Sequence, residues 1–181
     1  MESVQRYDAM TIILHWFTAV LVLVLWVGAR ALHGMPPGAL RADGRSLHIV
    51  LGLFLGALGG GRFVWRLSFG RPLPPTDSGW MGTAARLTHG GLYTLLAAMV
   101  LIGILLAWMG GDSLFNQFTP AALDADNQAL AEQLRRVHSL IGWAIVAVVA
   151  AHSAAVLFHH YALKDSVLAR MMPRGGLEDD Q

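Results

Sequence analysis

Residues 137–163 read VHSLIGWAIVAVVAAHSAAVLFHHYAL and contain no Asp, Glu, Lys or Arg. A helix needs about 20 apolar residues to cross the hydrocarbon core of a bilayer, so this stretch is long enough to span a membrane. Three further stretches lack formal charge, 9–29, 46–61 and 87–111, and the second extends to residue 65 if Arg62 reaches the interface with its long side chain. We therefore predict an all-α integral membrane protein, a four-helix bundle with spans at about 10–31, 46–67, 88–109 and 138–161.

The composition excludes several other classes of protein. Hydrophobic residues make up 55% of the 181 residues and charged residues only 14%, whereas a soluble domain usually carries about 25% charged residues. The chain has no cysteine, which excludes iron–sulfur clusters, thiolate zinc sites and thiol nucleophiles. With 13 basic and 12 acidic residues, it has no excess of positive charge that would indicate binding to nucleic acid. The chain does have 8 histidines, and histidine is a common metal ligand.

The positions of Lys and Arg predict the orientation. Eight of the 13 lie in the N-terminal segment, the second loop or the C-terminal segment, and the other five lie in the first and third loops. Because loops rich in Lys and Arg stay in the cytoplasm, both termini are expected on the cytoplasmic side of the membrane. We call this side inner and the opposite side outer.

The first apolar run is longer than that of a signal peptide and its leader is not clearly basic, so we expect a span there rather than a cleaved leader.

The chain is predicted to form one membrane domain over residues 1–181, and its connecting segments differ in character. The prolines within 71–75 cannot continue a helix, which ends the second span there. In the third loop, Thr119 followed by Pro120 is typical of a helix start and predicts a short surface helix over 121–136. The last residues, 175–181, are acidic and contain glycine, and we expect them to form a disordered tail.

Two histidines of the fourth span share one face of the helix. His138 and His152 are 14 residues apart, so they end within about 40° of each other and about 21 Å apart along the axis. His159 lies seven residues further on and returns to the same face, offset by about 20°. Because histidine is costly in a membrane unless it faces the bundle and finds a partner, one helix is expected to present imidazoles at two depths.

Each of these depths has a matching histidine on another span. His48 begins the second span at the outer level of His138, and His15 lies at the inner level of His152. Two imidazole pairs at two depths are the arrangement that two stacked b-type haems require. A single membrane histidine is more often only a hydrogen-bonding residue, and His89 competes with His15 at the inner level, although its neighbours favour a non-ligand role. Small residues that leave room for a flat ring are Gly52, Gly56, Gly59, Gly60, Gly61, Gly142 and Ala144.

The sequence resembles the bacterial cytochrome b561 family over nearly its whole length. The similarity is carried by Leu14-His15-Trp16, by His48, and by His138 with His152. It continues in His159-His160-Tyr161, in Lys164-Asp165 and in residues 168–174, LARMMPR. The resemblance implies a small inner-membrane protein with two haem b groups, ligated by His15 and His152 at the inner level and by His48 and His138 at the outer level.

The resemblance also implies an activity. Members of this size are similar to superoxide oxidases, which take electrons from periplasmic superoxide and reduce ubiquinone, so the implied partners are superoxide, ubiquinone and membrane lipid. One alternative is a cytochrome b subunit that conducts electrons between a dehydrogenase or hydrogenase and the quinone pool, with a redox protein as its partner. A second alternative is a non-haem metal transporter or sensor, although the four spans contain no Asp or Glu of the kind that cation transport uses.

Charged and polar residues near the span ends supply candidate substrate contacts. A positive entrance favours an anion such as superoxide, and the candidates for its guidance or for pairing with haem propionates are Arg41, Arg45, Arg135 and Arg136. The outer loops hold as many acidic as basic residues, so any attraction must come from local clustering. At the inner side, the candidates for contact with a quinone or a propionate are His159, His89 and Lys164.

Overall fold

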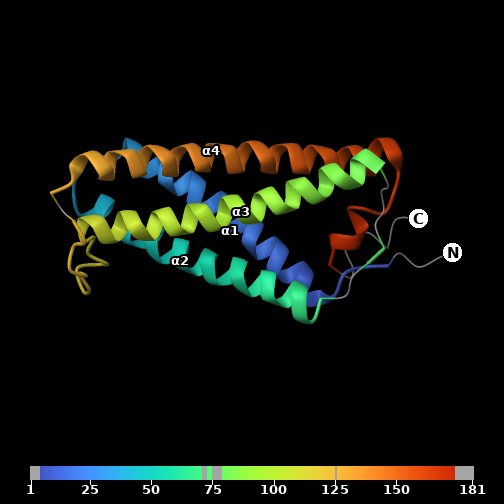
Figure 1. The fold of residues 1–181 in the computed structure, drawn as a ribbon, viewed down its shortest axis with the longest axis horizontal. Helices are drawn as coiled ribbons and strands as arrows, with labels where there is room; N and C mark the ends of the chain where they lie inside the picture. Colours follow the sequence, from blue (N-terminus) through green and yellow to red (C-terminus); the bar gives the residue numbers. More distant parts are fainter. Residues whose placement is uncertain (1–4, 71–72, 75–78, 125, 174–181) are drawn as a thin grey trace.

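The computed structural model describes residues 5–70, 73–74, 79–124 and 126–173, and most of them lie in helices. Four long helices follow one another along the chain (Figure 1): α1 (Ala9–Gly34), α2 (Ala39–Ser68), α3 (Gly79–Gly110) and α4 (Gln128–Phe158). Beyond α4 the chain makes a π-helical turn, η1 (His159–Leu163), and later a short 3₁₀ turn, η2 (Ala169–Met171). Each long helix is long and apolar enough to cross a membrane, which confirms the four predicted spans.

The helices extend beyond the predicted spans. α2 begins at Ala39 rather than near residue 46, α3 at Gly79 rather than near 88, and α4 at Gln128 rather than near 138. The bilayer core needs only about 20 apolar residues of each helix, so the charged turns that limited the prediction continue the same helices at their ends. Hydrophobicity predicts the membrane-crossing part of a helix and not its full length.

The surface helix predicted over 121–136 is wrong. Residues 119–124 and 126–127 are not helical, and α4 begins only at Gln128. The Asn127 side chain caps α4 by accepting a 3.1 Å hydrogen bond from the N–H of Leu130, so Asn127 has the role that Thr119 was expected to have. The Leu123 N–H donates to the carbonyl of Trp108 at 3.0 Å, which holds this segment against the end of α3.

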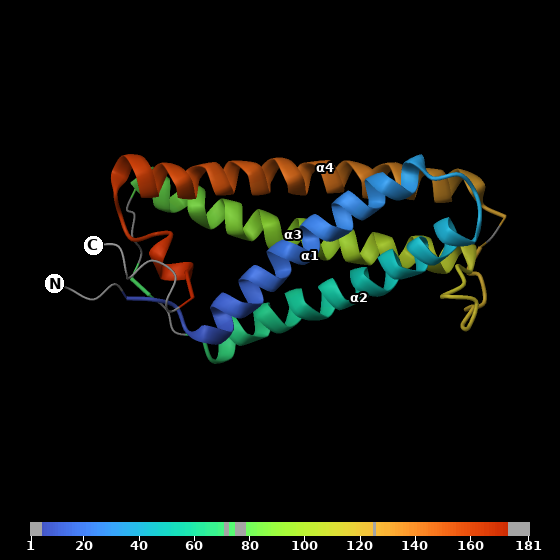
Figure 2. The same cartoon turned by 180° about the vertical axis from the view of Figure 1, so that it is seen from behind.

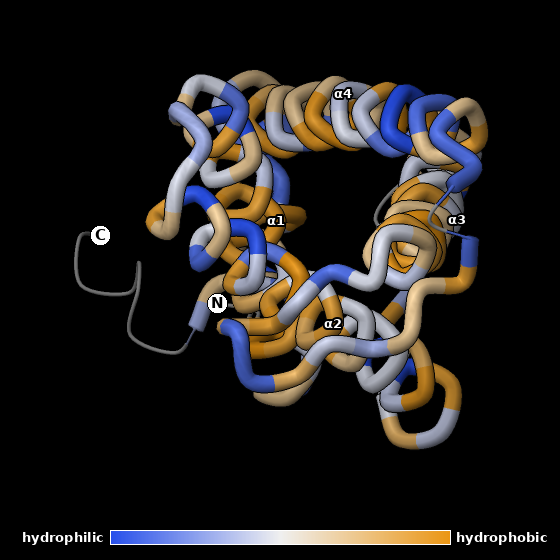
Figure 3. Tube along the Cα trace, turned by 90° about the vertical axis from the view of Figure 1, so that its left-hand side faces the viewer, coloured by the Kyte–Doolittle hydropathy of each residue, from blue (hydrophilic) through white to orange (hydrophobic). Residues whose placement is uncertain are grey.

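The helices pack in chain order, α1 against α2, α2 against α3 and α3 against α4. Seen from behind, α1 runs obliquely from the start of the bundle beside α2 to its other end beside α4 (Figure 2). Leu21 and Leu25 of α1 form a buried cluster with Leu55 of α2. A Cβ on Gly56 would lie 2.9 Å from Cγ1 of Val100, so glycine at this position allows α2 and α3 to approach closely. The end view shows the four largely apolar helices arranged around a common centre (Figure 3).

The segment that follows α4 folds back under the inner end of the bundle. Arg170 accepts a hydrogen bond from the Tyr7 N–H at its carbonyl (3.1 Å) and donates from its guanidinium to the carbonyl of Pro74 (2.7 Å). The described residues nearest the two termini therefore lie at the same end (Figure 1), and we predict from the distribution of Lys and Arg that this end is cytoplasmic. Of the C-terminal motif 168–174, Arg174 lies outside the described residues, as does the predicted tail 175–181.

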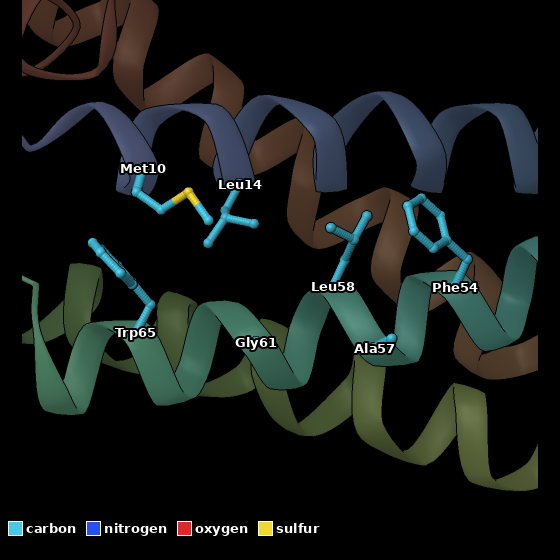
Figure 4. Close-up of a pocket in the computed structure, with 7 residues that line it drawn as sticks. All are labelled: Met10, Leu14, Phe54, Ala57, Leu58, Gly61 and Trp65. Carbon is cyan, nitrogen blue, oxygen red and sulfur yellow. The ribbon is translucent and has the colours of Figure 1, made fainter.

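An apolar groove of about 240 Å³ lies between α1 and α2 (Figure 4). Its lining consists of Met10, Leu14, Phe54, Ala57, Leu58, Gly61 and Trp65. None of these residues is a predicted ligand or substrate contact, although Leu14 adjoins His15 and Gly61 is one of the small residues expected to leave room for a flat ring.

Candidate functional site

The outer part of the bundle brings together His48 of α2 and His138 of α4. Their ring centroids lie 6.5 Å apart and the rings are inclined by 75°. Both residues are half-buried. Gly103 of α3 lies beside His138, since a Cβ there would be 3.2 Å from the imidazole Cε1. The missing side chain at residue 103 therefore leaves room for the His138 ring.

At the inner level, His15 of α1 faces His152 of α4. Their ring centroids are again 6.5 Å apart, and the rings are inclined by 71°. His89 of α3 lies 5.5 Å from His152, so the structure brings all three predicted inner histidines together. Trp16, next to His15, donates its indole N–H to the Met171 carbonyl at 2.9 Å. The C-terminal segment thus anchors the turn of α1 that carries His15.

The spacing within each pair fits a metal ion held between two imidazoles. Two metal–nitrogen bonds of about 2 Å, plus about 1.2 Å from each nitrogen to its ring centre, place the centroids about 6.4 Å apart. Both pairs match this value, whereas His89 is too close to His152 to hold an ion between the two rings. Within the described part of the chain, Nδ1 of His15 is buried without a hydrogen-bond partner. Because buried imidazole nitrogens are normally bonded, this orphaned atom also fits a site that binds a further group.

The four outer arginines are all exposed, but they differ in charge pairing. Arg45 forms a 2.6 Å ion pair with Asp112, and Arg135 forms a 3.1 Å pair with Glu132. Arg41 and Arg136 have no ion pair with any of the described acidic residues. Two of the four predicted cations are therefore locally neutralised, as the equal numbers of outer acids and bases suggested.

The loop that follows α3 is fixed to α2 beside His48. The Ser46 hydroxyl donates to the Ser113 carbonyl at 3.1 Å and accepts from the Phe115 N–H at 3.0 Å. Phe115 and Asn116 both have left-handed backbone conformations, with φ of 51° and 57°, which lets the chain reverse direction here. Together with the Arg45–Asp112 pair, these contacts hold the loop next to the turn of α2 that carries His48.

At the inner surface, His159 is bonded to the segment that follows it. Its Nδ1 lies 2.5 Å from Oδ2 of Asp165. Burial alone would raise the pKa of the Asp165 carboxyl, but the hydrogen bonds from His159 and from the Val167 N–H, with the Arg170 charge, hold that pKa below its usual value. Lys164 is exposed and adopts a left-handed conformation, with φ of 54°, where the chain leaves η1.

Two residues at the inner level were not expected in the site. The Arg62 guanidinium lies 5.6 Å from the centroid of the Tyr93 ring and within electrostatic reach of His15, His89 and His152. From the sequence, Arg62 is expected only to reach the interface. The sequence did contain an indication that Arg62 lies in the site, because a charged residue within an apolar span usually faces the protein interior. Tyr93 and Gly103 carry no such signal.

The comparisons with known proteins agree with these observations. The family model for prokaryotic cytochrome b561 matches residues 6–174. The chain belongs to the prokaryotic cytochrome b561 family. Probable superoxide oxidase CybB of Yersinia pestis is 31% identical over 173 residues, 94% of this chain and 97% of that protein. Cytochrome b561 homologs 1 and 2 of Escherichia coli K12 are 31% and 30% identical over 174 and 180 residues, 93% of this chain in each case and 98% and 92% of the relatives.

Membership gives the histidine pairs a chemical context. This cytochrome b561 is a multi-pass protein of the bacterial inner membrane that transfers electrons, and cytochromes of the b type carry haem b. Imidazole is an established axial ligand of haem iron, and the donor set of each pair fits that role. The family therefore favours a haem-based function over a non-haem transporter or sensor.

Proposed function

We propose that this cytochrome b561 binds two haem b groups and transfers electrons from superoxide to ubiquinone. The proposed axial ligands are His15 with His152 at the inner level and His48 with His138 at the outer level. The observation that carries the proposal is the equal 6.5 Å spacing of two imidazole pairs at two depths. His89, which is closer to His152, is proposed as a neighbour of the inner ligands and not as a ligand.

Superoxide is proposed as the donor because the chain is similar along nearly its whole length to a protein named as a probable superoxide oxidase. Two superoxide anions each lose one electron and leave as dioxygen, and ubiquinone gains two electrons and two protons to form ubiquinol. Bound haem supplies the one-electron redox chemistry, and the protein supplies ligation, position and local charge. The two pairs are held on rigid membrane helices, which fixes their depths.

For the approach of superoxide, we propose Arg41 and Arg136 as the principal guiding charges. Both are exposed, and neither is paired with a described acidic residue. Arg45 and Arg135 contribute less because Asp112 and Glu132 neutralise them at short range. The attraction is therefore expected to be local and sensitive to ionic strength.

For the quinone, we propose contact with the inner surface, where the candidates are His159, His89 and Lys164. Reduction to the quinol consumes two protons, and His159 offers an imidazole whose Nδ1 is held by the Asp165 carboxylate. The carboxylate orients the ring. In this proposal His159 passes protons from the cytoplasmic side to the quinone. Lys164 and His89 bind the oxygens of the quinone or a haem propionate.

Rapid mixing of the oxidised holoprotein with superoxide, in the presence of ubiquinone, tests the proposed function. We expect the haem absorption bands to show reduction, and one ubiquinol to form for every two superoxide anions consumed. Superoxide dismutase added before mixing is the control and should abolish both signals. If superoxide leaves the haem oxidised while a reduced quinone or a redox protein reduces it, the chain is an electron-conducting subunit and the proposal is wrong.

A further inference from the structure

Arg62 is a cation at the inner histidine level that has no carboxylate partner among the described residues. It lies on α2, is half-buried, and interacts electrostatically with His15, His89 and His152. No ion pair joins Arg62 to a described acidic residue, and the predicted spans 10–31, 46–67, 88–109 and 138–161 contain no Asp or Glu. A guanidinium that is partly removed from water is stabilised best by an anion, and a carboxylate matches its paired N–H donors.

Tyr93 places a second donor beside the same cation. The Arg62 Cζ lies 5.6 Å from the centre of the Tyr93 ring, so the two side chains of α2 and α3 are adjacent. The Tyr93 hydroxyl is buried and has no hydrogen-bond partner among the described residues. A buried hydroxyl without a partner is unusual, so an acceptor from outside the chain fits this position.

The helices that carry these donors favour one source of carboxylate. The inner histidine pair comes from α1 and α4, whereas Arg62 and Tyr93 come from α2 and α3. A haem held between α1 and α4 would present its edges to the remaining sides of the site, and those sides include α2 and α3. A neutral quinone would not neutralise the charge of Arg62. A propionate would neutralise this charge and would also accept a hydrogen bond from the Tyr93 hydroxyl.

We propose that Arg62 and the Tyr93 hydroxyl together bind a propionate carboxylate of the inner haem. This inference rests on the proposed function only in that His15 and His152 bind a haem. Arg62 and Tyr93 act as positioning residues, because they touch the cofactor at its edge and not the iron. Arg62 also favours the reduced state of the inner site, since a nearby cation stabilises an added electron.

The test uses the His48→Ala background, in which the inner haem is expected to be the one that remains. Arg62→Leu, Arg62→Lys and Tyr93→Phe are compared with Arg66→Leu, which removes an exposed arginine one turn away on the same helix. The readouts are haem per chain, the reduction midpoint, and the propionate bending bands in resonance Raman spectra. None of them depends on activity with superoxide or ubiquinone.

We expect Arg62→Leu to weaken haem binding about tenfold, as loss of an outer-shell contact commonly does, to lower the midpoint and to shift the propionate bands. Arg62→Lys should keep most of the midpoint because it keeps the charge, and Tyr93→Phe should shift the bands with a smaller loss of haem. Arg66→Leu should match the background protein in haem content and in the propionate bands, and it should lower the midpoint only slightly, because Arg66 is exposed although it lies within electrostatic reach of His89.

Three results would overturn the proposal. Arg62→Leu could match Arg66→Leu in every readout, which would make Arg62 an ordinary interfacial charge. Arg62→Leu could change the midpoint without shifting the propionate bands, which would mean that another anion, such as a lipid headgroup, occupies the site. Finally, Arg62→Leu could be made in the chain that keeps both histidine pairs. If this variant lost ubiquinone reduction while all three haem readouts stayed constant, Arg62 would be assigned to the quinone. A wild-type chain without haem would instead contradict the proposed function itself.

Discussion

The outer and inner histidine pairs have the same ring spacing but different surroundings. At the outer level, His48 and His138 lie beside the bare backbone of Gly103, and the arginine one turn before His48 is neutralised by an aspartate. The inner rings of His15 and His152 are also 6.5 Å apart, but a third imidazole lies beside His152, and the Arg62 guanidinium, which stacks near Tyr93 and has no carboxylate partner among the described residues, lies within electrostatic reach of both rings.

This comparison distinguishes two tasks of the protein, which are to ligate the iron and to set how tightly each site holds an electron. Ring spacing decides whether an iron can be ligated, and here it is equal at the two levels. The surrounding charge decides which site holds an electron more tightly, and the cation lies at the inner level. In the proposed function this asymmetry favours transfer from the outer site, near superoxide, to the inner site, near the proposed quinone contact at His159.

Removal of one histidine should produce the largest effect. His138→Ala is expected to abolish the outer haem and His152→Ala the inner one, because each iron loses one of its two axial ligands. Haem content, measured as pyridine haemochromogen, should fall from two per chain to about one in each variant. His160→Ala, which changes a histidine outside both pairs, is the matched control and should retain both haems. Loss of both haems from either variant, or of neither, would contradict the pairing.

The paired histidines could be predicted from the sequence, whereas their surroundings could not. Helical periodicity alone brings His138 and His152 to one face at two depths, because both lie on the same helix. The contact between Arg62 and Tyr93 joins two helices, and it depends on how α2 and α3 rotate and approach each other. Close packing at Gly56 helps to set that approach, and the pattern of a single chain does not encode it.

A side chain at residue 103 should affect the outer pair alone. In Gly103→Ala the new Cβ would lie 3.2 Å from Cε1 of His138, so the imidazole must shift by a few tenths of an ångström. We expect outer haem occupancy to fall several-fold, about twofold to tenfold, while the inner haem is retained. Gly28→Ala, where nothing lies within 4 Å of the new Cβ, is the control for the helix-stabilising effect of alanine. Equal losses from both sites would mean that the effect is global.

Release of Arg45 from its aspartate should increase the positive charge available at the outer level. In Asp112→Asn the 2.6 Å ion pair is lost, so we expect the rate of haem reduction by superoxide to rise by about twofold to tenfold at low salt. The increase should disappear at high ionic strength, because salt screens exposed charges. Glu132→Gln, which frees the exposed Arg135, should act in the same direction and less strongly. A rate that is independent of both changes would exclude guidance by these arginines.

The smallest expected effect concerns the inner surface. Asp165→Asn removes the carboxylate that bonds His159, which should cost about 1 kcal/mol of stability at neutral pH. Because the folded-state pKa of Asp165 is lowered, its contribution is full above the unfolded-state pKa of about 4 and is lost as the pH falls through the folded-state value. The difference in Tm between wild type and variant should therefore vanish at low pH. A difference that persists there would mean that the carboxylate charge is not its cause.

The central claim is that two irons are each held by two imidazoles, one pair at each depth. Low-temperature electron paramagnetic resonance of the oxidised holoprotein, combined with a haem count per chain, tests it most directly. We predict two haem b groups per chain and two low-spin ferric signals typical of bis-imidazole ligation. A single haem per chain, or a high-spin signal from an iron with only one imidazole, would contradict it.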